Sequence, residues 1–139
     1  MNFSLEVGPH TDLDTLPPVK DVYITMLPGG DYKETAAKSG DLVKKGFNPV
    51  PHFPARSIAD EAQLKDYISR CKDVGAKQAL VIGGSREPIG KFDSSIQILE
   101  TGFFDGIKIG IAGHPEGSQD MSDKELEKAM IDKKPYADY

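Results

Sequence analysis

The stretch Gln78-Ala79-Leu80-Val81-Ile82-Gly83-Gly84 decides the fold class, because an unbroken apolar run leads directly into a diglycine. A strand that keeps one face in water alternates apolar and polar residues, whereas a strand buried on both faces reads as a continuous apolar run. Ile107–Ala112 (IKIGIA) has a similar composition. Both stretches therefore predict strands inside a parallel sheet.

Helical patterns separate segments of this kind along the chain. In Asp60–Val74, apolar residues recur at the spacing of one helix face, and Gly75 is a typical residue to end such a helix. Alternating strands and helices predict a parallel sheet with the helices outside it. The predicted strands are Phe3–Val7, Val22–Leu27, Phe47–Phe53, Gln78–Ile82 and Ile107–Ala112.

The other predicted helices are marked less clearly. Tyr32–Lys45 is followed by Gly46, and Asp93–Glu100 is a shorter candidate. Ser122–Glu125 has the form of a capping box, which indicates the start of a further helix. Thr11–Val19 is too short and too proline-rich for a crossover helix, so the first connection departs from the pattern.

Composition restricts the class of protein. The 139 residues are 38% hydrophobic and 28% charged, as in a soluble globular domain. The net charge is −5 and the basic residues are scattered singly, which argues against a nucleic-acid partner. No apolar run approaches the roughly 20 residues that span a bilayer, and the N-terminus does not have the form of a signal peptide. A single cysteine, Cys71, excludes an internal disulfide and suits a cytoplasmic protein.

Polar residues and glycines recur where the predicted strands end. Ligands of parallel α/β sheets bind at the C-terminal ends of the strands, because the following loops converge there. The residues that we expect at this end are Glu6, Thr25, His52, Arg56, Gly83, Gly84, Ser85, Arg86 and His114. A carboxylate, imidazoles and guanidiniums would then lie close together.

Structural roles compete with binding roles at several of these positions. Glu6 is either a solvent-facing residue of an edge strand or a carboxyl that is paired or has its pKa set for a task. His52 is either a satisfied core histidine or a ligand contact. Gly83-Gly84 is either a tight turn or a place where backbone amides approach a ligand.

Other chemistries are excluded by the motifs that the sequence lacks. It contains no CxxC or HExxH spacing, no GxSxG elbow, no P-loop and no GxGxxG after a strand. Cys71 lies on an apolar helix stripe and is interpreted as core packing. His10 is interpreted as solvent-exposed, and Arg56 and Arg86 could be ordinary surface charges.

Four segments, read in order, resemble the methylenetetrahydrofolate reductase family. Ser4-Leu5-Glu6-Val7 resembles the family's S-x-E-[FV] opening, and Asn48–His52 resembles its P-[VA]-P-H strand end. Ala79–Ser85 stands in the place of its A-L-R-G-D loop, and Ile111–Gly117 is similar to its V-A-G-Y-P-E-G segment. Order and spacing agree over almost the whole chain, and the last two matches are the more specific. The forms PHFPAR at 51–56 and GHPEG at 113–117 suggest a divergent branch.

This resemblance implies a flavoprotein with a (β/α)8 TIM barrel. Members of the family bind FAD at the top of the barrel, take a hydride from NAD(P)H and reduce 5,10-methylenetetrahydrofolate to the 5-methyl form. By resemblance, Glu6 is the acid that protonates the folate nitrogen and so opens the methylene bridge to an electrophilic iminium. The residues that match positions beside FAD are Thr25, His52, Ile82, Gly83, Gly84, Ser85 and His114.

The chain also departs from the family pattern. Ser85 replaces a carboxylate beside the flavin pyrimidine, which removes a negative charge and should make the flavin easier to reduce. Gly83 replaces a neighbouring Arg, for which Arg86 is a nearby cation, and His114 and Ser118 replace a Tyr and a His. These departures leave a second hypothesis, a flavin- or folate-binding barrel that lacks reductase activity.

Length suggests that the barrel is incomplete. A complete barrel needs about 250 residues and eight strands, whereas this sequence predicts five strands. An open half-barrel would expose parallel edges and an apolar interior. We therefore expect residues 1–139 to be the N-terminal portion of one barrel domain, a fragment that is inactive alone. A third hypothesis is a complete five-stranded open α/β binding domain with flavodoxin-like winding. The choice between NADH and NADPH, and homo-oligomerisation of the full-length protein, stay open.

Overall fold

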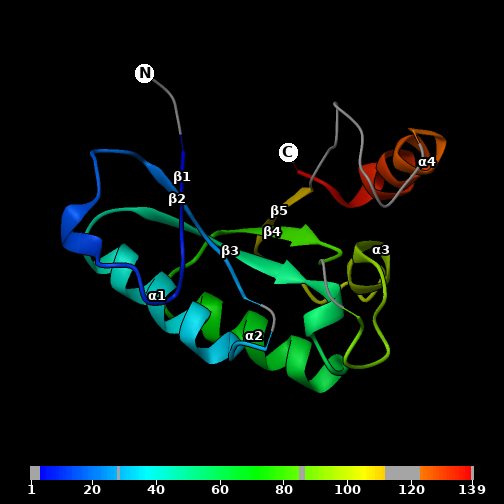
Figure 1. Ribbon diagram of the computed structural model, residues 1–139, viewed down its shortest axis with the longest axis horizontal. Helices are drawn as coiled ribbons and strands as arrows, with labels where there is room; N and C mark the ends of the chain where they lie inside the picture. The colour runs from blue at the N-terminus through cyan, green and yellow to red at the C-terminus, as the bar shows by residue number, and fades with distance from the viewer. Residues whose placement is uncertain (1–3, 28, 85–86, 112–122, 139) are drawn as a thin grey trace.

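The computed structural model describes residues 4–27, 29–84, 87–111 and 123–138. Within these ranges, parallel strands form one five-stranded sheet in the order β1-β2-β3-β4-β5 (Figure 1). The strands are β1 (Leu5–Val7), β2 (Asp21–Ile24), β3 (Asn48–Pro54), β4 (Gln78–Ile82) and β5 (Lys108–Ile111). The predicted α/β class and the five predicted strands are confirmed.

Helices lie in the connections between the strands. Figure 1 shows α1 and α2 next to each other on one side of the sheet. The α-helices are α1 (Tyr32–Lys44), α2 (Glu61–Asp73), α3 (Ser95–Leu99) and α4 (Asp123–Lys133). Short 3-10 turns are η1 (Leu13–Thr15), η2 (Ala55–Ser57) and η3 (Lys134–Tyr136). As predicted, the connection from β1 to β2 has only a 3-10 turn among its described residues.

The ends of α1 and α2 follow from local chemistry. The carboxylates of Asp31 and Asp60 accept hydrogen bonds from the first-turn amides of Lys33 and Gln63, and so cap the two N-termini. After each helix a glycine adopts a positive φ, 88° at Gly46 and 98° at Gly75, which residues with a Cβ rarely adopt. The predicted capping box at Ser122 falls outside the described residues.

The main core lies between the sheet and α2. The Phe53 ring of β3 stacks on Tyr67 of α2 with ring centroids 4.0 Å apart. The Tyr67 hydroxyl donates a 2.7 Å hydrogen bond to the backbone carbonyl of His52. Cys71 is buried in the same cluster, as predicted, and burial raises the pKa of its thiol to about 12. This thiol is therefore a packing group rather than a nucleophile.

The strand order distinguishes a flavodoxin-like sheet from a sheet whose strands follow one another in sequence order. A flavodoxin-like sheet has the order 2-1-3-4-5, with a switch point in the middle, whereas the strands here follow the order of the sequence. β1 and β5 form the two edges of this sheet, and closure into a barrel is not seen within the described residues. At the outer edge of β5, the Asp138 amide donates a 2.7 Å hydrogen bond to the Ile109 carbonyl.

Candidate functional site

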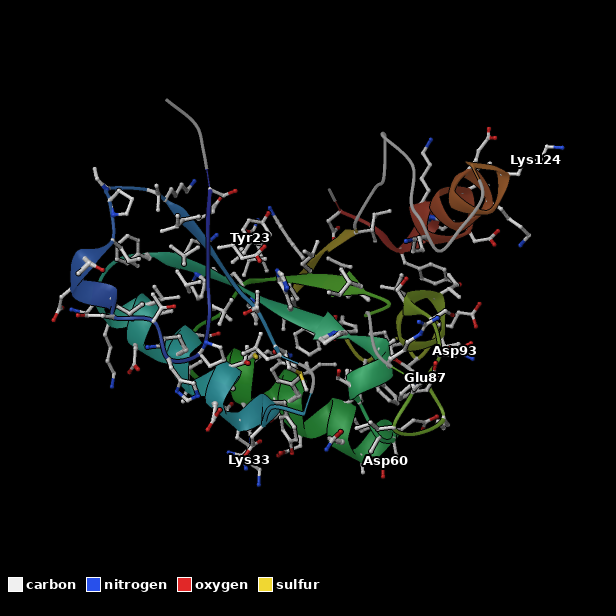
Figure 2. All side chains as sticks on the ribbon, in the orientation of Figure 1. Tyr23, Lys33, Asp60, Glu87, Asp93 and Lys124 are labelled. Carbon is white, nitrogen blue, oxygen red and sulfur yellow. The ribbon has the colours of Figure 1, made fainter. Side chains whose placement is uncertain are left out.

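Strand alternation divides the sheet into two faces. Val22, Ile24, Phe53, Ala79 and Val81 are buried in the clusters that include residues of α1 and α2. Their sequence neighbours point to the opposite side, which we call the open face. Figure 2 shows Tyr23 on this side of the sheet, away from α1 and α2. The residues that strand register places on the open face include Glu6, Tyr23, Asn48, Val50, His52, Gln78, Leu80 and Ile82.

Glu6 is exposed on the edge strand β1. Its register partner on β2 is Tyr23, so the two side chains project from neighbouring positions of the open face. The solvent-facing interpretation of Glu6 therefore agrees with the structure as described. Proton donation near neutral pH requires a carboxyl that is shielded from water. The described residues alone do not shield Glu6 in this way.

His52 is the most unusual residue of the open face. Only 8% of it is exposed, and its Nε2 atom has no hydrogen-bond partner among the described residues. The Tyr23 ring meets the imidazole edge-on, with ring centroids 6.1 Å apart. Burial lowers the pKa of His52, while the Glu6 carboxylate opposes this shift through its charge. His52 is thus a buried histidine whose Nε2 has no hydrogen-bond partner in the described part of the chain, which differs from the satisfied core histidine that was the alternative.

A polar bridge crosses the beginnings of three strands. The Asn48 side-chain amide donates hydrogen bonds to Asp21 Oδ1 at 2.8 Å and to Gln78 Oε1 at 2.6 Å. These are the first residues of β3, β2 and β4. The bridge therefore ties the strands together at the end opposite to the expected ligand site.

The predicted cofactor residues that follow β2 and β4 lie close to the sheet. The Thr25 hydroxyl donates to the Val7 carbonyl at 3.3 Å, and Ile82 is half-buried at the end of β4. Gly84 has a φ of 95°. A Cβ at Gly84 would meet Pro54 at 3.4 Å, whereas a Cβ at Gly83 would have nothing within 4 Å. Gly84 thus provides the positive φ that the turn requires, and Gly83 borders open space.

Some expected contacts cannot be placed. Ser85, Arg86 and His114 fall outside the described residues, so their proximity to Glu6 and His52 stays a prediction. Arg56 is described, and its Nε lies 3.2 Å from a carboxylate oxygen of Asp93. His10 is exposed, as predicted, with its Nε2 3.4 Å from a Glu34 oxygen. Tyr23 is therefore the register partner of Glu6 on one side and the ring neighbour of His52 on the other.

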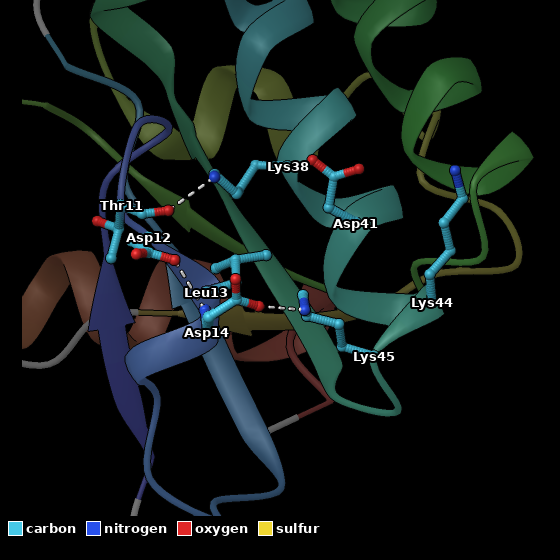
Figure 3. Close-up of a pocket in the computed structure, with 8 residues that line it drawn as sticks. All are labelled: Thr11, Asp12, Leu13, Asp14, Lys38, Asp41, Lys44 and Lys45. Carbon is cyan, nitrogen blue, oxygen red and sulfur yellow. Dashed lines mark hydrogen bonds and ion pairs between the residues drawn. The ribbon is translucent and has the colours of Figure 1, made fainter.

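A separate hollow of about 500 Å³ lies between η1 and the second half of α1 (Figure 3). Lys38 reaches from α1 to the Thr11 carbonyl at 2.8 Å, and Lys45 reaches Asp14 at 2.6 Å. The close-up shows both lysines directed at the η1 loop. The hollow opens to solvent and these cationic groups already have partners, so it is interpreted as ordinary surface.

Clusters of metal-ligating side chains and membrane-spanning helices are absent from the part of the chain that the structure describes. It contains no group of three or more His, Cys, Asp or Glu side chains that could hold a metal ion. None of its helices is long and apolar enough to span a bilayer. No protein-family profile matches the sequence.

Two features of the site were not predicted. Tyr23 was assigned only to a strand, and Asn48 only to a strand and a motif. Their partners are distant in the sequence, with separations of 27 residues for Asp21–Asn48 and 30 for Asn48–Gln78. The signal that could have found the bridge is the amide or carboxylate at the first position of three successive strands.

Proposed function

We propose that this chain forms the N-terminal part of a (β/α)8 barrel that binds FAD and reduces 5,10-methylenetetrahydrofolate with NAD(P)H. The sequential parallel order supports a singly wound sheet, in which each strand adds next to the one before it. The hydrogen bond from Asp138 to Ile109 supports continuation of this order, because it places backbone at the outer edge of β5. The open face would then be the interior of the barrel.

The observation that carries the proposal is the unpartnered Nε2 atom of His52. Leaving a buried polar atom without a hydrogen bond costs about 1–3 kcal/mol. An unsatisfied buried atom of this kind calls for an explanation, and a bound ligand that supplies the missing partner is the one that we propose. His52 follows the P-x-P pattern at the end of β3, where the family resemblance expects a flavin contact. A bound flavin would satisfy the nitrogen and cover the open face.

The residues present fit such a cofactor. Gly83 leaves open space where a side chain would project, so a flat ring or a phosphate could approach its backbone closely. The residues that would hold FAD are Thr25, His52, Ile82, Gly83 and Gly84, together with Ser85 and His114. Bound FAD would accept a hydride from NAD(P)H and pass it to the folate.

Glu6 would supply the proton for the folate nitrogen. It shares the open face with His52, and its charge acts on the imidazole. The bound cofactor, folate and further barrel strands would have to exclude water from Glu6, since a shielded carboxyl holds its proton to higher pH.

The exposure of Glu6 favours a second candidate, a flavin- or folate-binding barrel without reductase activity. The two candidates separate in the product of the complete gene, reconstituted with FAD. The reductase predicts a flavin spectrum that NAD(P)H bleaches and that methylenetetrahydrofolate restores under anaerobic conditions. Bleaching without restoration would support the binding barrel. Failure to take up FAD would refute both.

A further inference from the structure

The connection from β4 to α3 is hydrogen-bonded, through its backbone, to the segment that follows β3. The Arg56 amide donates a 3.0 Å hydrogen bond to the Gly83 carbonyl, and the Ile89 amide donates one of 3.0 Å to the Arg56 carbonyl. Further along, the Lys91 amide donates to the Ala59 carbonyl at 3.3 Å. The first of these bonds extends the pairing of β3 and β4 beyond its last register pair, Pro54 with Ile82.

Arg56 contacts both ends of this connection. Its backbone is bonded to Gly83, where the connection begins. Its side-chain Nε donates to the Asp93 carbonyl at 2.8 Å and lies 3.2 Å from Asp93 Oδ1, just before α3. A Cβ placed on Gly84 would also stand 3.6 Å from the Arg56 Cβ. Arg56 is therefore hydrogen-bonded both to the diglycine turn and to the residue just before α3.

Gly90 shows how closely the two segments approach each other. A Cβ at this position would overlap the backbone carbonyl group of Ala59. Backbone cannot move aside as the end of a long side chain can, so any other residue at Gly90 would displace the connection. The path of the described part of this connection is thus determined by contacts with residues 56–59.

The ion pair itself adds little to the stability of the fold. The side chains of Arg56 and Asp93 are 38% and 67% exposed, and exposed pairs of this kind are screened by water. A directional hydrogen bond from Nε to a backbone carbonyl, by contrast, fixes geometry. Arg56 is therefore suited to position the connection more than to stabilise the protein.

We propose that Arg56 is a positioning residue that holds the Gly83-Gly84 turn in place for the cofactor. This inference rests on the proposed flavin site, but it concerns a residue that the family resemblance does not assign to that site. Arg56 would not contact the flavin. It would act through Gly83, whose carbonyl its own backbone amide binds, and through Asp93.

The test compares Arg56→Gln with Lys91→Gln in the product of the complete gene. Lys91 forms another ion pair of this connection, at 2.7 Å from Glu61, but its side chain does not join the two ends. We expect Arg56→Gln to raise the Kd for FAD by up to about 10-fold, because the turn would lose the side-chain link to Asp93 while it keeps the backbone hydrogen bond from residue 56 to Gly83. Its melting temperature should stay close to that of Lys91→Gln, which should bind FAD like the wild type. Arg56→Lys should recover little, because an ammonium lacks the planar donor geometry.

Amide hydrogen exchange gives a readout that does not depend on flavin. Arg56→Gln should speed exchange at Ile89 and Lys91, whereas an Asp93→Asn variant, which keeps the carbonyl acceptor, should have a smaller effect. If the wild type binds FAD and Arg56→Gln binds it with the same Kd, the role of Arg56 is overturned while the flavin proposal stands. An equal loss of affinity in Lys91→Gln would also overturn it. Absence of FAD binding by the wild type would remove the flavin proposal as well.

Discussion

The hydroxyl of Tyr67 in α2 donates a 2.7 Å hydrogen bond to the backbone carbonyl of His52 in β3. The same ring stacks on Phe53, so α2 contacts β3 at two consecutive residues. Burial raises the pKa of Tyr67 well above its usual range, and its proton is therefore present to donate. The backbone of His52 is thus hydrogen-bonded to α2 on one side of the sheet, while its imidazole projects to the open face on the other side.

Tyr67→Phe should destabilise the protein by about 1–2 kcal/mol, because the ring stays but the buried hydrogen bond is lost. Urea unfolding at neutral pH measures this change in the free energy of unfolding. Tyr32→Phe is the matched control, since the Tyr32 hydroxyl bonds to Asp66 on the half-exposed surface between α1 and α2. Tyr32→Phe should lower the free energy of unfolding by less than Tyr67→Phe does. Equal losses in the two variants would show that the bond to His52 contributes nothing particular.

Much of the sheet could be predicted from the sequence, because short segments rich in apolar or β-branched residues alternate with helical patterns, and β4 is an almost continuous apolar run. Gln78–Ile82 was predicted with the bounds that the structure has, and α1 and α2 differ from their predicted ranges by only a residue or so at an end. Periodicity and terminal glycines are local signals, and they suffice for elements of this length.

The site was less predictable, because it depends on register and on what covers the open face. The sequence marked Glu6 and His52 as candidates, but it could not show that Glu6 is exposed while His52 is buried. The edge contact of Tyr23 with His52 requires the alignment of β2 with β3. The bridge at Asn48 likewise joins residues from three strands, which no local pattern brings together.

The buried imidazole of His52 predicts a pH dependence of stability. Burial lowers its pKa below the usual 6.5, so the unfolded chain binds a proton there more readily than the folded protein does. Stability should be fully present above pH 6.5 and should fall as the pH drops below it, by up to about 1.4 kcal/mol per pH unit until the folded pKa is reached. Urea unfolding between pH 7.5 and about 5 should show this slope in the wild type.

The control for this slope uses another histidine. His52→Leu should flatten the part of the pH dependence just below 6.5. The matched control is His10→Gln, which removes an exposed histidine instead. If the pH dependence of stability below pH 6.5 is the same in His52→Leu, groups other than His52 cause it.

Asn48→Asp should destabilise the sheet by about 1–3 kcal/mol at neutral pH, because the new carboxylate has no proton to donate to Asp21 and Gln78. Adding Asp21→Asn should recover part of the loss, since that amide can donate to the new carboxylate. The free energies of unfolding of the two single variants and the double variant test this directly. Additive losses in the double variant would mean that the bridge does not couple the strands.

We propose that Glu6 donates a proton to a folate beside bound FAD. The most direct test measures the two half-reactions of Glu6→Gln separately, in the FAD-loaded product of the complete gene. Reduction of the flavin by NAD(P)H should proceed at nearly the wild-type rate, because no proton from Glu6 is needed. Anaerobic reoxidation by methylenetetrahydrofolate should slow by about 10²- to 10⁴-fold, the usual contribution of a general acid. Equal slowing of both half-reactions, or reoxidation at the wild-type rate, would contradict this role for Glu6.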